Sequence, residues 1–227
     1  MLDSGLIFFM KYPERGLVKN RLAEELGDDL TVRLYSNFVL DVLETCQMVE
    51  AETIIAYSIS NNMKNKKLFW NGEFKDFPQK GDDPGKKIFN AMSEASKMGY
   101  KKCVVIGTDS PDVPAAVIGE AFEMLNECDA VIGPGSDGGY YLLGLAQDKI
   151  DPKIFEKIKW GSPSVFEDIH RNIKKCGLTN HVLPEWDDIE DINDLKRYYS
   201  RYRYHRNGSN TMDFLRENQE LLERWLN

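Results

Sequence analysis

The chain has 227 residues, of which 42% are hydrophobic and 29% charged, and its formal net charge is -8 at pH 7. A chain of this length can bury a full core, and single α/β domains commonly reach this size. A surface with this excess of negative charge repels phosphate backbones, so we predict no nucleic-acid partner. Any site for phosphate groups must be a local cluster of basic residues.

The composition also limits targeting and metal chemistry. No apolar run approaches the roughly 20 residues needed to span a bilayer, and residues 6–10 are too few for the core of a signal peptide. We therefore predict a cytoplasmic protein with no membrane span. The four cysteines include no CxxC pair and the three histidines are scattered, which predicts buried, reduced thiols rather than disulfides or zinc ligands. A bound metal would then use oxygen ligands, as Mg²⁺ and Mn²⁺ do.

The first part of the chain alternates strand-like and helix-like segments. Residues 6–10 form a continuous apolar run that is typical of a buried strand. A loop containing Pro13 and Gly16 follows it and carries four cations, at Lys11, Arg15, Lys19 and Arg21. Apolar residues then recur at helical spacing over residues 31–49. Residues 53–59 predict a second strand.

The centre of the chain is organised around an apolar run that stops at an acid. Residues 104–106 predict a buried strand, and residues 107–111 predict the turn that ends it. Asp109 therefore lies at the carboxyl end of a strand, where ligands bind in open α/β sheets; a capping role before the following proline is the alternative. Residues 86–97 predict a helix leading into this strand. Residues 69–85, rich in glycine and proline, predict an ordered loop over the sheet.

A glycine-rich loop at residues 133–139 separates two short predicted strands, at residues 130–132 and 140–143. Its G-x-G-x-x-G pattern formally matches a dinucleotide fingerprint, but that fingerprint leads into a helix, whereas a strand follows here. We predict instead that the glycines let a ligand approach the backbone, with Asp137 accepting hydrogen bonds from hydroxyls. A plain hairpin is the alternative.

The last part of the chain combines an acidic segment with a basic, tyrosine-rich tail. Helix and strand patterns at residues 162–175 and 178–183 precede a cluster of four acids, Asp187, Asp188, Glu190 and Asp191. Residues 194–227 predict two helices. Their interleaved arginines and tyrosines resemble a stacking surface for single-stranded nucleic acid, but an amphipathic helix with inward tyrosines explains the same pattern, and we favour it. The alternation of strands and helices predicts a mainly parallel α/β sheet.

Two groups of charged residues could act together on a phosphorylated ligand. The cations of the first loop, Lys11, Arg15, Lys19 and Arg21, suit phosphate groups, and Gly16 would bring backbone amides close; a solvated basic turn is the alternative. Asp109 and the acidic cluster supply hard oxygen ligands for a divalent ion. Such a set suits a metal-bound diphosphate, whose chemistry needs charge neutralisation and positioning.

The order of these motifs resembles a bacterial family of GT-A-type glycosyltransferases of unknown specificity. That family belongs with the nucleotide-diphospho-sugar transferases and is related to the molybdenum-cofactor guanylyltransferase-like proteins. The resemblance covers about residues 5–198. It is carried by K-x-P-x-x-G-x-V-K-x-R-L from Lys11, G-T-D-S-P from Gly107, G-P from Gly133 with D-G-G-Y from Asp137, Trp160, and D-x-E-x-x-x-D-L from Asp188.

The resemblance implies a fold and a set of roles. The fold would be a GT-A, Rossmann-like three-layer sandwich with a mainly parallel central sheet over residues 1–198, followed by a helical extension over residues 199–227. Nucleotide phosphates would bind to Gly16, Lys19 and Arg21, and the charge pattern of the loop adds Lys11 and Arg15. The metal, Mg²⁺ or Mn²⁺, would bind to Asp109, and Glu190, or Asp188 beside it, would complete the metal site. The sugar or acceptor would face Asp137, Gly138, Gly139 and Tyr140.

Three positions depart from the family pattern. Asn20 stands where threonine is usual, Glu190 stands where aspartate is usual, and residues 81–87 differ from the usual Gly-Asp-Leu-Gly-Glu-Arg-Met. Because glutamate is only one methylene longer than aspartate, it could still bind a metal. The changed loop bears on base or sugar specificity.

These observations predict a metal-dependent transferase that binds a nucleoside diphosphate sugar and transfers the glycosyl group to an unknown acceptor. Asp109, Lys19 and Arg21 are the predicted catalytic residues, because they would stabilise the departing diphosphate. One alternative is a nucleotidyltransferase that joins a nucleoside triphosphate to a phosphorylated acceptor and releases pyrophosphate. Another is a non-catalytic nucleotide-binding relative, which Asn20 and the changed loop suggest.

Overall fold

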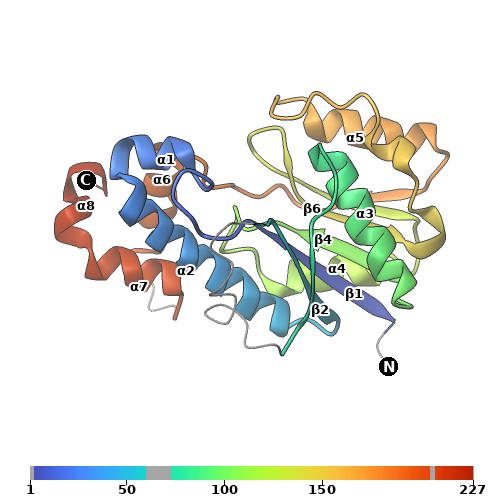
Figure 1. The fold of residues 1–227 in the computed structure, drawn as a ribbon, viewed down its shortest axis with the longest axis horizontal. Helices are drawn as coiled ribbons and strands as arrows, with labels where there is room; N and C mark the ends of the chain where they lie inside the picture. Colours follow the sequence, from blue (N-terminus) through green and yellow to red (C-terminus); the bar gives the residue numbers. More distant parts are fainter. Residues whose placement is uncertain (1–2, 60–72, 205–207, 227) are drawn as a thin grey trace.

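A single seven-stranded sheet with helices on both faces forms the frame of the described chain (Figure 1). The computed structural model describes residues 3–59, 73–204 and 208–226. The strands lie in the order β3-β2-β1-β4-β6-β5-β7, and β6 alone runs antiparallel to its described neighbours. Their bounds are β1 Ser4–Met10, β2 Glu52–Tyr57, β3 Lys75–Pro78, β4 Lys102–Ile106, β5 Ala130–Pro134, β6 Tyr140–Ala146 and β7 Asn180–Val182.

Two helical layers cover this sheet, which confirms the predicted three-layer α/β class. Helices α2 and α4 pack on one face of the sheet, α6 to α8 extend this layer through contacts with α1, α2 and one another, and α3 and α5 pack on the other face (Figure 1). The helices are α1 Asn20–Leu26, α2 Asp28–Gln47, α3 Pro84–Lys97, α4 Ala115–Met124, α5 Val165–Lys175, α6 Ile192–Tyr202, α7 Asn210–Glu217 and α8 Gln219–Leu226. Short 3₁₀ turns, Gln147–Lys149 and Pro152–Phe155, follow β6.

The first strand shows why the core strands are apolar throughout. Leu6, Phe8 and Met10 of β1 pack against the layer that contains α2, whereas Ile7 packs against the layer that contains α3. Successive side chains of a strand point to opposite faces, and both faces are covered here. A continuous apolar run is therefore what this position in the sheet requires.

The centre of the sheet contains a topological switch point. β1 pairs with β2 on one side and with β4 on the other, and Phe8 lies opposite Ile106. The chain leaves β1 toward β2 and β3, then returns through α3 to β4 on the far side of β1. The carboxyl ends of β1 and β4 therefore lie side by side, and the crevice at such a point is where open α/β sheets bind ligands.

Several element predictions need correction. The loop predicted over residues 11–21 is too long, because α1 begins at Asn20, and the ordered loop predicted over residues 69–85 contains β3 and the start of α3. β3 is an edge strand that ends at Pro78, where a proline is tolerated because no further strand must pair with it. The polar loop predicted at residues 60–67 and the start of the 69–85 segment lie outside the described residues.

The described part of the tail forms three helices rather than the predicted two. Tyr198 and Tyr199 are buried in the core, which supports the amphipathic interpretation over a stacking surface, although Tyr204 is exposed. The domain boundary predicted between residues 198 and 199 falls inside α6, and the division itself stays a prediction. Among the described residues, no helix combines the length and the apolar character that crossing a bilayer requires.

The α7 segment is fastened to the body of the protein by Asp41 of α2. The buried carboxylate accepts hydrogen bonds from the Ser209 hydroxyl at 2.9 Å, the Asn210 backbone N–H at 2.6 Å and the Thr211 backbone N–H at 2.9 Å. The first N–H groups of a helix lack partners within that helix. A carboxylate from another helix therefore caps α7.

Replacing Asp41 with alanine should lower the free energy of unfolding by about 3 kcal/mol, because it leaves several buried donors without an acceptor. Urea denaturation of the wild type and the variant measures this change. Glu44→Ala is the matched control on the same helix, since Glu44 accepts one hydrogen bond, from the Asn210 side chain at 3.1 Å; we expect a loss of about 0.5 kcal/mol. Equal losses in the two variants would contradict the capping role.

Candidate functional site

Four loops meet at the carboxyl edge of the sheet. They follow β1, β4, β5 and β7, and cover residues 11–19, 107–114, 135–139 and 183–191. Predicted functional residues follow closely after the ends of β1, β4 and β5. Contacts and electrostatic interactions between these loops bring together one cation and four carboxylates, namely Lys19, Asp109, Asp137, Asp188 and Glu190.

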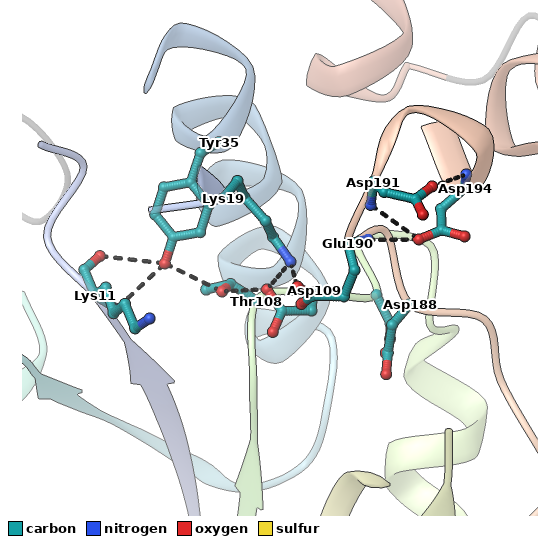
Figure 2. A network of polar contacts seen from close by, with 10 residues as sticks. Lys11, Lys19, Tyr35, Thr108, Asp109, Asp188, Glu190, Asp191 and Asp194 are labelled. Atoms are coloured by element: carbon teal, nitrogen blue, oxygen red, sulfur yellow. Dashed lines mark hydrogen bonds and ion pairs between the residues drawn. The ribbon is translucent and has the colours of Figure 1, made fainter. Parts of the chain in front are cut away.

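Lys19 is at the centre of this group (Figure 2). Its Nζ forms an ion pair with Asp109 Oδ1 and a second one, at 2.8 Å, with Glu190 Oε1. Only 4% of the Lys19 side chain is exposed. Lys19 is the N-cap of α1 and has φ 45° and ψ 51°. These angles lie in the left-handed region, which residues other than glycine rarely adopt. Strain of this kind is concentrated at functional sites.

The two carboxylates keep this buried ammonium charged. Burial alone would lower the pKa of Lys19, but Asp109 and Glu190 outweigh it and raise the pKa above its usual value. Burial raises the pKa of Glu190, and the charges of Asp109 and Asp137 act in the same direction, while Lys19 opposes them. The site therefore contains more negative groups than its one buried cation can neutralise.

A buried tyrosine joins the loops that follow β1 and β4 (Figure 2). The Tyr35 hydroxyl accepts hydrogen bonds from the Lys11 N–H at 3.2 Å and from the Thr108 hydroxyl at 3.1 Å, and donates one to the Lys11 carbonyl at 3.3 Å. Burial and the nearby Asp109 raise the pKa of Tyr35, so the phenol stays protonated. Tyr35 thus ties the start of the cationic loop to the residue before Asp109.

The acidic segment is held by its own backbone and by α6. The Ile189 N–H donates to the Asp109 carbonyl at 2.8 Å, which joins the loops after β4 and β7. The N–H groups of Glu190 and Asp191 donate to Asp194 Oδ2 at 2.9 and 3.0 Å (Figure 2). Asp191 and Asp194 form a capping box at the start of α6. The position of Glu190 is therefore set by the helix that follows it.

Asp188 is a carboxylate without a cationic partner in the described part of the chain. It accepts a hydrogen bond from the Ser110 hydroxyl. Burial, followed by the charges of Asp109 and Asp137, raises the pKa of Asp188 to about 7 against the lowering effects of Ser110 and of the Lys19 charge. An unneutralised carboxylate beside two others has the hard oxygen donors that Mg²⁺ and Mn²⁺ prefer. The donor chemistry thus fits a divalent cation.

The predicted metal ligands do not form a ready-made cluster. Within the described residues, no group of three or more His, Cys, Asp or Glu side chains is arranged to hold a metal ion. The ammonium of Lys19 lies between Asp109 and Glu190 instead. The assignment of Asp109, Glu190 and Asp188 as metal ligands therefore stays a prediction. Because the Lys19 ammonium already contacts Asp109 and Glu190, a metal ion at this site would have to be compatible with that ammonium.

The other cations of the first loop behave differently from Lys19. Lys11 and Arg21 are exposed, and neither forms an ion pair with any residue the structure describes. Arg15 forms an exposed ion pair with Asp29. Gly16 has φ 73°, a backbone conformation that favours glycine. Two cations without an ion pair to a described residue and an open backbone turn are therefore available to an anion at this edge of the sheet.

The glycine-rich loop is a hairpin between β5 and β6, and the strand after it confirms that the dinucleotide fingerprint does not apply. Its glycines are required by close packing: a Cβ on Gly135 would lie 2.8 Å from Asp188 Oδ2, and a Cβ on Gly138 would lie 2.1 Å from the Pro163 carbonyl oxygen. Asp137 Oδ1 accepts a hydrogen bond from the Gly139 N–H at 2.7 Å. The predicted contact of residues 137–140 with sugar or acceptor stays a prediction.

Tyr35, Thr108 and Ser110 are site residues that sequence reasoning did not assign. Tyr35 lies at an apolar position of its helix and was indistinguishable from a core residue. Thr108 and Ser110 flank Asp109 within the G-T-D-S-P motif, and this position beside a predicted site residue was the one sequence signal that could have identified them. Only the folded structure shows that their hydroxyls reach Tyr35 and Asp188.

Comparison with known proteins agrees with this fold. A structure from Desulfovibrio desulfuricans G20, provisionally named a nucleotide-diphospho-sugar transferase, is 34% identical to this chain, covers 99% of each chain and has a TM-score of 0.92. The fold is therefore that of the nucleotide-diphospho-sugar transferases, as the resemblance implies, while the relation to the molybdenum-cofactor guanylyltransferase-like proteins stays a prediction. The chain belongs to the family described as "Uncharacterized protein conserved in bacteria (DUF2064)", whose model matches residues 40–162.

More distant structures share the fold at low sequence identity. A cytidylyltransferase from Leptospira borgpetersenii serovar Hardjo-bovis is 12% identical and covers 97% of each chain, with a TM-score of 0.59. The manganese complex of a protein from Mycobacterium tuberculosis H37Rv is 10% identical and covers 86% of this chain and 97% of that chain, with a TM-score of 0.50. At these identities the likeness shows the fold alone. No curated protein matches the chain in sequence.

Removing the Tyr35 hydroxyl should loosen the junction between two loops of the site. We expect Tyr35→Phe to lower the free energy of unfolding by about 2 kcal/mol, because the Lys11 backbone and the Thr108 hydroxyl lose a buried partner. Thermal or urea unfolding measures the change. Tyr199→Phe is the control, because Tyr199 is a largely buried tyrosine whose hydroxyl forms no hydrogen bond with a described residue; the loss for this variant should stay below about 0.5 kcal/mol. A neutral Tyr35→Phe change would rule out this bridging role.

Proposed function

We propose that this protein is a transferase that binds a nucleoside diphosphate sugar together with Mg²⁺ or Mn²⁺ and moves the glycosyl group to an acceptor. One observation carries the proposal. The buried ammonium of Lys19 bridges two carboxylates at the switch point of the sheet, beside a loop with unpaired cations. Opposite charges are thus concentrated where this class of fold binds ligands.

The cationic loop supports binding of the nucleotide phosphates. Lys11 and Arg21 are free to neutralise a diphosphate, and the turn at Gly16 can present backbone N–H groups to it. Arg15 could join them by leaving its exposed pair with Asp29, since exposed ion pairs are weak. Lys19 is the fourth cation proposed to contact the phosphates.

The acids support binding of a divalent cation. Asp109 and Asp188 are the proposed main ligands, with Glu190 as the third, and the manganese complex of the distant M. tuberculosis structure is in line with this choice. A bound divalent cation would neutralise the charge that the departing diphosphate gains. Asp137, Gly138, Gly139 and Tyr140 lie on the β5–β6 side of the same edge and are proposed to face the sugar or the acceptor.

The proposed reaction is a glycosyl transfer. The acceptor's hydroxyl oxygen forms a bond to the anomeric carbon, and the bond between that carbon and the diphosphate oxygen breaks. The electron pair of the broken bond goes to the diphosphate, and the hydroxyl proton is released. Lys19 and Arg21 would stabilise the developing negative charge on the leaving diphosphate.

A second candidate is nucleotidyl transfer, which the likeness to a cytidylyltransferase fold favours. In this reaction a phosphate oxygen of the acceptor attacks the α-phosphorus of a nucleoside triphosphate, and pyrophosphate leaves. The same cations and carboxylates would serve, because the leaving group is again a diphosphate. The two candidates differ in product: a glycosyltransferase releases a nucleoside diphosphate, whereas a nucleotidyltransferase releases pyrophosphate.

Asp109→Asn should abolish metal-dependent nucleotide binding, because it removes a charge and little volume. A thermal-shift screen of nucleoside triphosphates and nucleoside diphosphate sugars, with and without Mn²⁺, tests this. A ligand at 100 times its dissociation constant adds about 2.7 kcal/mol of stability. We expect a Mn²⁺-dependent rise in Tm for one nucleotide class in the wild type and none in the variant.

Asp148→Asn is the matched control for this screen. Asp148 is an exposed carboxylate in the turn after β6, and because β6 is antiparallel it lies at the opposite edge of the sheet. This variant should keep the full ligand shift. An Asp109→Asn protein with an undiminished shift would refute the proposed metal role, and the absence of any shift in the wild type would refute nucleotide binding.

A further inference from the structure

Lys19 is placed differently from the other cations that are proposed to bind phosphate. Lys11 and Arg21 are exposed and unpaired in the described part of the chain, whereas the Lys19 side chain is 4% exposed and its ammonium contacts Asp109 and Glu190. Figure 2 shows this ammonium between side chains from the β4 loop and from the segment before α6. Lys19 thus neutralises, from within the protein, two of the carboxylates proposed to bind the metal.

The contacts of Lys19 and the proposed metal site are in conflict. Asp109 is the main proposed metal ligand, yet its Oδ1 already contacts the ammonium, and Glu190 Oε1 is 2.8 Å from the same ammonium. A divalent cation on these carboxylates would lie close to a buried positive charge, and the low dielectric of a partly buried site strengthens that repulsion. A further anion that comes between the two cations would relieve this repulsion.

We infer that Lys19 acts as an internal substitute for the metal, which keeps the divalent cation weakly bound until a nucleotide arrives. The inference rests on the proposed function for the identity of that anion, a nucleotide phosphate. In the nucleotide-free protein, Lys19 holds Asp109 and Glu190 together. When phosphate groups occupy the crevice, they give the ammonium a new partner and free the two carboxylates for the metal.

This arrangement makes metal and nucleotide binding mutually dependent. If the nucleotide tightens metal binding by some factor, the metal tightens nucleotide binding by the same factor. Asp188, which forms no ion pair with a described residue, and Asp137 remain as carboxylates for a cation in the nucleotide-free state. A bare metal ion is therefore kept at low occupancy, although carboxylates outnumber the buried cation at this site.

The test is a direct titration of the full-length protein with Mn²⁺ and no nucleotide, in which free Mn²⁺ is followed by electron paramagnetic resonance. Lys19→Met removes the charge and keeps the length of the side chain. We expect the variant to bind Mn²⁺ at least about tenfold more tightly than the wild type. Adding Asp109→Asn to Lys19→Met should remove the gained affinity, which would locate the ion at Asp109.

Two matched variants separate a local effect from a general change in charge. Lys11→Met makes the same charge change on the same loop, at an exposed lysine with no ion pair among the described residues, and should alter Mn²⁺ affinity by less than about threefold. Lys19→Arg keeps a cation between the carboxylates and should bind Mn²⁺ as weakly as the wild type. If Lys19→Met fails to fold, Lys19→Gln replaces it, since a neutral amide can still donate hydrogen bonds to both acids.

Equal Mn²⁺ affinity of the wild type and of the folded neutral variant would overturn the inference, as would an equal gain in Lys11→Met. These results are independent of the nucleotide screen. A gain in Lys19→Met beside a wild type that binds no nucleotide would support the substitute role of Lys19 while refuting the proposed function. Nucleotide binding by the wild type, together with a Mn²⁺ affinity that is unchanged in Lys19→Met, would support the proposed function while refuting the substitute role of Lys19.

Discussion

The burial of one ammonium group is the constraint on which the site depends. A buried charge is strongly unfavourable unless it is paired and hydrogen-bonded, so Lys19 can be inside only if Asp109 and Glu190 are held against it. These partners lie far apart in the sequence, one near the middle of the chain and one toward its C-terminal end, and the backbone supplies the necessary rigidity. Ile189 is bonded to the backbone of Asp109, and Asp194 holds the backbone of Glu190. The loops are therefore arranged before any ligand binds.

The last turns of α6 belong to this arrangement as well. Arg201 of α6 forms an ion pair with Asp187, immediately before Asp188, and lowers the pKa of Asp187. Asp112, three residues after Asp109, accepts hydrogen bonds from the Trp186 indole at 2.9 Å and from a tyrosine hydroxyl of α6 at 2.7 Å. The last turns of α6 therefore brace both the acidic segment and the β4 loop. Cutting the chain near residue 198 would remove part of that brace.

The fold was largely predictable from the sequence, whereas the contacts within the site were not. Apolar runs such as residues 6–10 and 104–106 show strands buried on both faces, and they place Asp109 at a strand end. β3 was missed because an edge strand needs only one partner and has a weak pattern. The site was predicted as two groups, cations for phosphate and acids for metal, and the contact between Lys19 and Glu190 joins them across 171 positions of the chain. Sequence spacing carries no signal for such a pair, since tertiary packing creates it.

The balance of charge in the crevice favours a ligand of mixed charge. Four carboxylates interact around one buried ammonium, and Asp188, raised to a pKa of about 7, shows that the negative charge there is incompletely neutralised. A bare anion would be repelled by these acids, and a bare divalent cation would be repelled by Lys19. An anion that arrives with a divalent cation would meet neither obstacle, because the metal would join the acids while the anion would join the lysine and the cations of the first loop. Such complementarity favours a metal–diphosphate ligand over either ion alone.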